Sequence, residues 1–159
     1  MDKLISGWQW NGIVSAQSGF AFTPVVGSKV SGTGDTNSPD TPNRNPDFQG
    51  KVILGNVEHW FDPRAFTVPL AGTFGNMARG SFIGPGLLNV DTSFFKRFGI
   101  NEQWSLQLRA EAFNILNHGN FRTPNPVVFS GNTISSSAGV LTATTTTSRQ
   151  VQFAVKLLF

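Results

Sequence analysis

The last eleven residues, RQVQFAVKLLF, restrict the fold most, because a large apolar side chain occupies every second position up to Phe159. A period of two is the period of a β-strand, whose successive side chains point to opposite faces. The stretch therefore predicts a strand over about 149–159 with one apolar and one largely polar face. The apolar positions are Val151, Phe153, Val155, Leu157 and Phe159.

The same alternation predicts three more strands, near residues 6–19, 87–98 and 103–116. Within 103–116, the good helix formers of LQLRAEAFNIL leave a helix open as an alternative, and strict alternation through Ala112 favours the strand. The composition agrees with a β-rich protein, because 15 Phe, 4 Trp and 17 Gly accompany a charged fraction of only 13%.

The connections between these strands differ sharply in length. Residues 99–103 read as a hairpin turn, whereas 20–86 and 117–148 are long, polar and rich in turn-forming residues. Short turns at one end and long loops at the other are typical of outer-membrane barrels. We therefore expect an all-β fold: an antiparallel meander of about four strands from a transmembrane β-barrel, with long loops at one end. An eleven-residue strand, rising ~3.3 Å per residue and tilted ~45°, covers roughly the 25 Å apolar band of such a barrel.

On this interpretation the apolar face contacts outer-membrane lipid, and the opposite face borders the barrel lumen. The parity that sends the apolar side chains to lipid turns Asp91, Arg109 and Glu111 toward the lumen. We favour a charge network between neighbouring strands for these three residues over contact with a substrate or a plug. Aromatic residues near the strand ends are expected to form the interfacial girdle: Trp8, Trp10, Phe20, Phe22, Trp104 and Phe159.

Residue types that carry chemistry are sparse. His59 and His118 lie in predicted loops, where exposed or packing roles are favoured over metal binding or general base catalysis. The carboxylates of DTNSPD, residues 35–40, lack the spacing of an EF-hand, and turn chemistry accounts for them better than calcium. We expect no catalytic, cofactor-binding or metal-binding residues, no cofactor and no enzymatic activity.

Two further features have a structural interpretation that we favour. Trp60, Phe61 and Phe66 lie in the first long connection, and we expect the loop to pack on itself rather than to present them to a ligand. The basic residues are scattered and the net charge is only +3, so no nucleic-acid-binding surface is predicted. The absence of cysteine excludes disulfides within this chain.

Residues 74–121, FGNMARGSFIGPGLLNVDTSFFKRFGINEQWSLQLRAEAFNILNHGNF, resemble the last part of TonB-dependent outer-membrane receptors. The similarity is greatest to the Oar-like branch, which carries a carboxypeptidase-regulatory-like domain, and HWFDPRAF (59–66) is similar to a loop of that branch. The resemblance implies that residues 1–159 are the C-terminal barrel portion of a receptor that imports an unidentified ligand. Such a receptor lies in the outer membrane of a Gram-negative-type bacterium and has about 22 strands around a plug.

The resemblance also implies partners. In that family the barrel-assembly machinery reads the final strand, a role that would fall to Val151, Phe153, Val155, Leu157 and Phe159. The rest of the barrel, the plug and the segment that engages TonB would lie outside this chain. A different class stays open: a soluble extracellular β-sandwich that binds glycans or adheres to surfaces, since sandwich strands alternate as well. A sandwich would seal residues 151–159 beneath a second layer.

Overall fold

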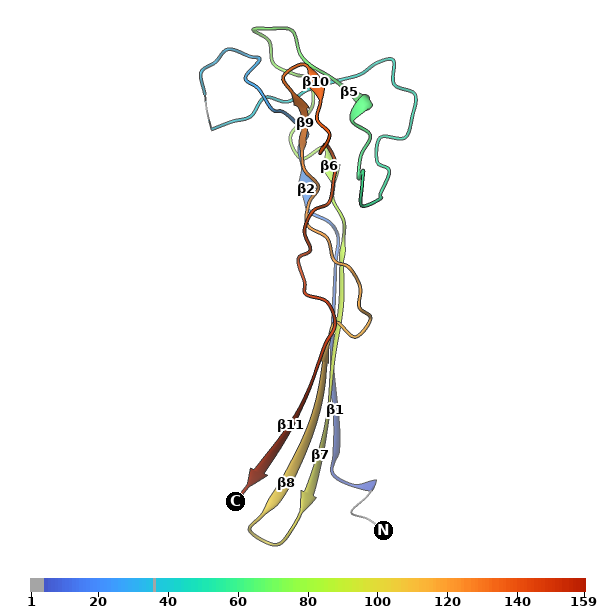
Figure 1. Ribbon diagram of the computed structural model, residues 1–159, viewed down its shortest axis with the longest axis vertical. Coiled ribbons are helices and arrows are strands. Elements are labelled where there is room, and N and C mark those ends of the chain that lie inside the picture. The colour runs from blue at the N-terminus through green and yellow to red at the C-terminus, as the bar shows by residue number, and fades with distance from the viewer. Residues whose placement is uncertain (1–4, 36) are drawn as a thin grey trace. The chain divides into compact units, whose positions relative to one another are not determined.

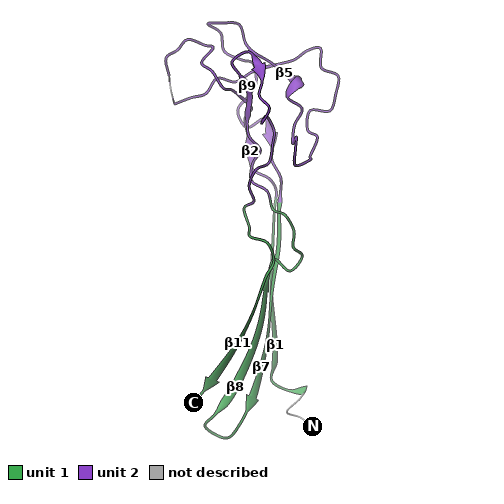
Figure 2. Ribbon diagram, viewed as in Figure 1, with its two compact units in different colours: residues 1–17, 87–120, 145–159 green, residues 18–86, 121–144 purple. Residues whose placement is uncertain are grey.

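The structure is a computed structural model that describes residues 5–35 and 37–159. Its long strands are β1 (Trp8–Gln17), β7 (Leu87–Gly99), β8 (Ser105–Phe113) and β11 (Gln150–Leu158) (Figure 1). These strands belong to unit 1, and residues 18–86 and 121–144 form a separate compact unit 2 (Figure 2). Within the described ranges, no helix is long and apolar enough to cross a bilayer.

The four long strands form one antiparallel sheet in the order β1-β7-β8-β11. Each lies within or beside a range where alternation predicted a strand, and the all-β, antiparallel expectation is confirmed. The segment with good helix formers is strand β8, because it pairs with β7 on one side and β11 on the other. Hydrogen bonds to two neighbours outweigh a helix preference of a few tenths of a kcal/mol per residue.

The connections follow the expected asymmetry. Gln17 at the end of β1 pairs with Leu87 at the start of β7, and Phe113 at the end of β8 pairs with Gln150 at the start of β11. Both long connections therefore leave from the same end of the sheet. At the other end, the β7–β8 hairpin turn is closed by a bond from the Ile100 amide to the Trp104 carbonyl at 2.9 Å.

Unit 2 has a core of its own, although its segments were expected only as long loops. Three small sheets are built from two- to four-residue strands, ordered β10-β9-β3, β2-β6 and β4-β5. The pair β3–β9 is parallel, unlike the antiparallel pairs elsewhere. The elements are β2 (Ala21–Phe22), β3 (Val25–Val26), β4 (Asn43–Arg44), the 3₁₀ helix η1 (Pro63–Ala65), β5 (Phe66–Thr67), β6 (Phe82–Ile83), β9 (Val127–Ser130) and β10 (Thr133–Ile134).

Aromatic rings fill the core of unit 2. Phe61 is fully buried, and its ring centroid lies 5.9 Å from that of Phe22 and 5.8 Å from that of Phe66. The Trp60 indole donates to the Ile83 carbonyl at 3.0 Å. The loop therefore packs on itself, as expected for Trp60, Phe61 and Phe66. The assignment of Phe22 to an interfacial girdle is wrong, because only 8% of this residue is exposed and its ring is core.

Two carboxylates organise turns in unit 2. Asp40 accepts hydrogen bonds from the Val30 amide, the Ser31 amide and the Ser31 hydroxyl at 2.6–2.9 Å. The Ser31 backbone bond is the main cause that holds the pKa of Asp40 below its ordinary value. Asp62 caps η1, and the hydrogen-bonded guanidinium of Arg64, 2.7 Å away, lowers the pKa of Asp62. Asp40, at the end of DTNSPD, thus has the turn role that its sequence suggested.

Candidate functional site

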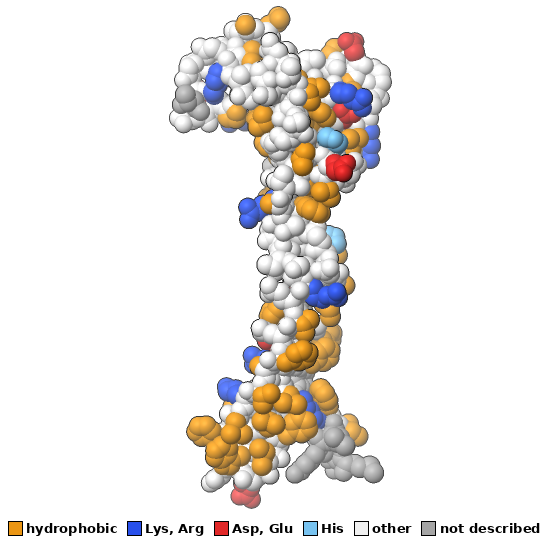
Figure 3. Space-filling view, viewed as in Figure 1, with side chains coloured by type: hydrophobic (Ala, Val, Ile, Leu, Met, Phe, Trp, Pro, Cys, Tyr) orange, Lys and Arg blue, Asp and Glu red, His pale blue; other side chains and the backbone are white. Residues whose placement is uncertain are grey.

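The register of the four-stranded sheet gathers apolar side chains on one face. Paired residues share a face, and the alternation of all four strands is in phase. Hydrophobic side chains gather over the long strands in the lower part of Figure 3. The large side chains of this apolar face are Trp8, Trp10, Val14, Leu88, Val90, Phe94, Phe98, Leu106, Leu108, Val151, Phe153, Val155 and Leu157.

The apolar face of β11 is open. Phe153 is 80% exposed and Val155 is 69% exposed, far more than the residues of a protein core. A contiguous exposed apolar surface marks contact with a membrane or another protein. A β-sandwich would need a second layer over these side chains, and the described chain supplies none. The sandwich alternative therefore does not fit this structure.

The five residues proposed as an assembly signal lie along this strand and just beyond it. Val151, Phe153, Val155 and Leu157 occupy alternate positions of β11 and share the apolar face. Phe159 follows the strand, and its ring centroid lies 5.3 Å from that of Trp104. β11 is also an edge of the sheet, with β8 as its one neighbour in the strand order. The arrangement presents an apolar ridge beside an open strand edge, and the assembly role itself stays a prediction.

Lys96 breaks the pattern of the apolar face, and sequence reasoning missed it. It pairs with Trp8 and Leu108 on that face, yet it is only 3% exposed. Its ammonium donates to the Ser6 carbonyl and lies 4.9 Å from the Trp8 ring centroid and 5.3 Å from that of Phe98. Aromatic faces stabilise a cation, and a charge on a lipid face costs least near the interface. The sequence feature that could have identified Lys96 is a charged residue close to the hairpin turn, at a position where the alternation predicts an apolar side chain.

The opposite, polar face brings the predicted lumen residues onto neighbouring strands. Glu111 lies in a cross-strand row with Asn11, Ser93 and Gln152. The Gln152 amide donates to one Glu111 carboxylate oxygen, and the Arg109 guanidinium lies 3.7 Å from the other. Arg109 also stands 4.6 Å over the Phe95 ring. Arg109 and Glu111 thus form one network.

Asp91 lies on the same face of β7 but is not bonded to that network. One of its carboxylate oxygens accepts from the Asn89 side-chain amide and from the Asn114 backbone amide, both at 2.8 Å. Its Cα partner on β1 is Ile13, the one apolar residue among those that β1 places on this face. Asp91 therefore holds the end of β8 beside β7, and its contacts are to amides rather than to a cation.

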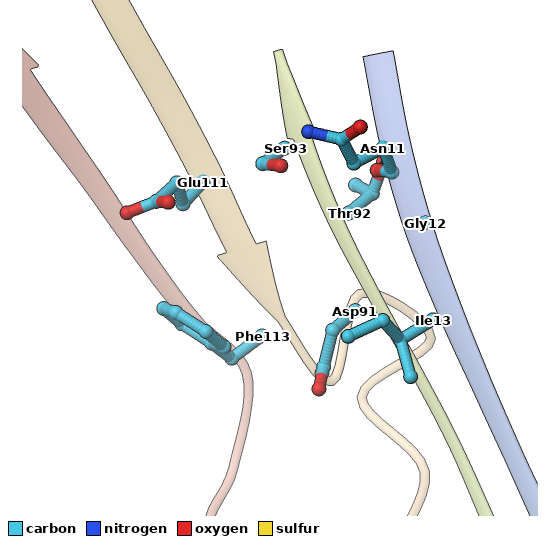
Figure 4. Close-up of a pocket in the computed structure, with 8 residues that line it drawn as sticks. All are labelled: Asn11, Gly12, Ile13, Asp91, Thr92, Ser93, Glu111 and Phe113. Carbon is cyan, nitrogen blue, oxygen red and sulfur yellow. The ribbon is translucent and has the colours of Figure 1, made fainter. Parts of the chain in front are cut away.

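An open hollow of about 180 Å³ lies on this face. Figure 4 shows Glu111 and Phe113 on one side, Asn11 and Ile13 on the other, and Asp91 and Ser93 between them. Carboxylates, an amide and a hydroxyl beside two apolar walls can hydrogen-bond a passing polar solute. Among the described residues, no three His, Cys, Asp or Glu side chains gather in a way that would hold a metal ion.

A cluster of asparagines at the long-connection end of the sheet was also missed. Asn120 is 1% exposed; its side chain accepts from the Leu88 amide at 2.7 Å and donates to the Leu88 carbonyl and the Thr146 hydroxyl at 3.0 Å. Asn114 is 3% exposed and donates to the carbonyls of His118 and Thr147. We call these two side chains the asparagine clamp, because they tie together the ends of three strands.

Both histidines are exposed. His118 lies beside the clamp, with its Nδ1 3.0 Å from the Asn120 side-chain oxygen. His59 lies in unit 2. The clamp had a weak sequence signal: the run NILNHGN carries three asparagines directly after a strand, and Asn114 and Asn117 adopt positive φ, which asparagine tolerates best after glycine.

Comparison with known proteins agrees with this geometry. Residues 1–152 match the family model described as outer membrane beta barrel domain. Searches of curated proteins and of solved structures found no match. The family accounts for an antiparallel sheet with one exposed apolar face, and it supports a location in the outer membrane. The chain belongs to the outer membrane beta barrel domain family.

Proposed function

We propose that this chain is the C-terminal barrel portion of a TonB-dependent receptor of the Oar-like type, which imports a ligand across the outer membrane of a Gram-negative-type bacterium. The resemblance of residues 59–66 and 74–121 to that branch supports the receptor type. Membership of the outer-membrane barrel family supports the membrane setting. The proposal assigns transport to the protein and no enzymatic step or nucleic-acid partner to this chain.

The observation that carries the proposal is the in-phase separation of apolar and polar side chains over four neighbouring strands. The strands contain 9 to 13 residues. At ~3.3 Å per residue and ~45° tilt they cover roughly 21 to 30 Å, which brackets the apolar band of outer-membrane barrels. The sheet is too narrow to close and leaves an edge at β1 and another at β11. Strands of the same barrel would pair with these edges.

Each face then has its partner. The apolar face contacts outer-membrane lipid, and the assembly machinery recognises the ridge from Val151 to Phe159. The polar face lines the interior, where Asp91, Arg109 and Glu111 border the plug and the path of the ligand. TonB acts through a part of the receptor outside this chain.

Orientation and location are tested first, in the full-length protein that carries this chain. Single cysteines at Gln152 and Phe153 are neighbours on opposite faces of β11; residues 1–159 contain no native cysteine, and any cysteine elsewhere in the full-length protein is first replaced with serine. We expect recovery in the outer-membrane fraction, reaction of Gln152→Cys with a water-soluble maleimide, and protection of Phe153→Cys from the same reagent until the protein is denatured, because the thiolate that reacts does not form in hydrocarbon. Recovery in the soluble fraction, or the reverse labelling pattern, would contradict the proposal.

Import is tested by genetics. A strain without the full-length gene and a strain without TonB should share a growth defect on one limiting nutrient, screened among iron chelates, cobalamin, oligosaccharides and peptides. Complementation with the intact gene should restore growth, and a gene lacking residues 149–159 should not. Normal growth of the deletion strain on every nutrient that requires TonB would contradict import.

A further inference from the structure

The charges of the polar face are segregated along the strands. Arg97 on β7, Gln107 on β8 and Lys156 on β11 form one cross-strand row near the hairpin turn. Arg109 lies two residues further along β8, on the same face. We call Arg97, Arg109 and Lys156 the basic patch. The acids of this face, Asp91 and Glu111, lie toward the opposite end of the sheet.

Two cations of the basic patch make no ion pair within the described part of the chain, and the nearest acidic residue of this region is Glu102 in the hairpin turn. Arg109 is paired with Glu111 at 3.7 Å. Arg97 donates from Nε to the Ser105 hydroxyl at 3.1 Å and makes no ion pair with a described residue. Lys156 is exposed and makes no ion pair there either. Charges facing an enclosed interior interact more strongly than charges in bulk water, so a counter-charge there has a large effect.

The shape of this region fits an extended occupant. The row spans three strands, so about 10 Å separates the backbone positions of Arg97 and Lys156. An extended peptide places alternate side chains about 7 Å apart, a spacing that the long arginine and lysine side chains can reach. Beside the row, an open hollow of about 460 Å³ is bordered by Arg97, Ser105 and Leu158, and by Glu102 of the hairpin turn at its rim.

We propose that the basic patch docks an acidic polypeptide segment inside the barrel. Aspartate or glutamate carboxylates of that segment pair with Arg97 and Lys156, and the Gln107 amide between them bonds to its backbone. Charge complementarity selects this occupant, and the exposed, flat arrangement lacks the buried donors that enclose a single small anion. The proposal rests on the proposed inward orientation of the polar face, but not on import.

The test is site-specific photo-crosslinking in the full-length protein in its native membrane. The photoreactive residue p-benzoylphenylalanine is placed at Ala154, which pairs with Arg109 and precedes Lys156 on the polar face. A control position, Ala112, lies on the apolar face. We expect a peptide adduct at Ala154 whose attached segment contains Asp or Glu within a few residues, and a lipid adduct at Ala112.

Reversing the charges of Arg97 and Lys156 then tests whether the crosslinked segment is held by its acidic side chains. The double variant Arg97→Glu/Lys156→Glu should lower the adduct yield at least about tenfold, and reversing the acids of the crosslinked segment to lysine should restore it. Lys51→Glu, an exposed lysine of unit 2, serves as the charge-matched control and should leave the yield unchanged. An unchanged yield in the double variant, a segment without acids, or loss of the adduct in millimolar inorganic phosphate would overturn the proposal. A lipid adduct at Ala154 would overturn the orientation as well, and thus the proposed function.

Discussion

Replacing Asn120 with alanine should loosen the long-connection end of the sheet. The Asn120 side chain makes four hydrogen-bond contacts, two to the Leu88 backbone, one to the Thr146 hydroxyl and one to His118. A hydrogen bond contributes about 0.5–1.5 kcal/mol net, and a buried partner left without one costs more. Water can replace part of the loss, because Leu88 is 37% exposed. We therefore expect the free energy of local opening to fall by about 2–4 kcal/mol.

Amide hydrogen exchange of the full-length protein in its membrane measures this opening. The reporters are the Thr145 amide, bonded to the Asn120 backbone carbonyl at 2.7 Å, and the Ile115 amide, bonded to the Val90 carbonyl at 2.8 Å. Neither bond is removed by Asn120→Ala, so faster exchange reports opening of the clamp. At tenfold per 1.4 kcal/mol, the expected acceleration is about 30- to 700-fold.

The control is Asn11→Ala, on the polar face of the same sheet. The Asn11 side chain is exposed and has one weak contact, with the Gln9 amide at 3.4 Å. It should change the exchange of the two reporters by less than about threefold, the effect of a surface substitution. Wild-type exchange of the reporters in Asn120→Ala, or equal acceleration in both variants, would refute the view that the clamp holds these strand ends together.

Three further outcomes follow from the faces, turns and contacts of the chain. Phe153→Arg should lower the amount of assembled barrel on a heat-modifiability gel, since a cation near the middle of the lipid face costs about 2–4 kcal/mol, whereas Gln152→Arg on the polar face should assemble normally; equal defects would contradict the facing. Because hydrogen bonding lowers the folded-state pKa of Asp40, its contribution to the stability of unit 2 is present above the ordinary value of 3.8 and is lost as the pH falls through the folded value. Protease resistance of wild-type unit 2 should thus decline in acid, and the part of the decline that is due to Asp40 should be missing in Asp40→Asn. Identical acid profiles of the two proteins would contradict a stabilising role of the Asp40 carboxylate. Gly75→Ala should make unit 2 markedly more protease-sensitive, because the new Cβ would lie 1.9 Å from a backbone carbonyl oxygen, while Gly99→Ala, which meets nothing within 4 Å, should not.

The four-stranded sheet could be predicted because alternation is a local property of each strand. Val151, Phe153, Val155 and Leu157 of β11 alternate strictly and share the apolar face, so no knowledge of the neighbouring strand was needed to place them. The same parity put Arg109 and Glu111 on one face before any pairing was known. Pairing between β7 and β8 then decided the helix-or-strand ambiguity of residues 103–116 in favour of the strand.

Unit 2 could not be predicted in the same way. Its strands of two to four residues are too short to show a period, and its core joins Phe22, Phe61 and Val128 from distant parts of the chain. Glycine- and proline-rich segments indicate where the chain turns, but they do not indicate which turns pack against one another. From the sequence, the aromatic rings of the unit 2 core were assigned to loops or to the interfacial girdle. Their burial could not be predicted because it arises from contacts between segments that are distant in the sequence.

The roles of the asparagine clamp and of Lys96 could not be predicted from the sequence for a different reason. Asparagine after a strand is the ordinary signal of a turn, and only the structure shows that Asn120 bonds to residues 32 and 26 positions away. Lys96 contradicted the parity of its own strand, and its compensation comes from Trp8 and Ser6 on another segment. Local patterns identify such residues as exceptions but do not name the groups that satisfy them.

The unbroken register of the four long strands has a consequence for how this sequence can change in length. A single inserted or deleted residue inside β8 would invert every side chain beyond that point, carrying Glu111 to the apolar face and Ala112 to the polar face. A change of two residues would keep each side chain on its face of the sheet but would shift the pairing of β8 with both β7 and β11. Length differences among homologous chains should therefore collect in residues 18–86 and 121–144 and at the hairpin turn, and odd-numbered ones should be missing from the strands.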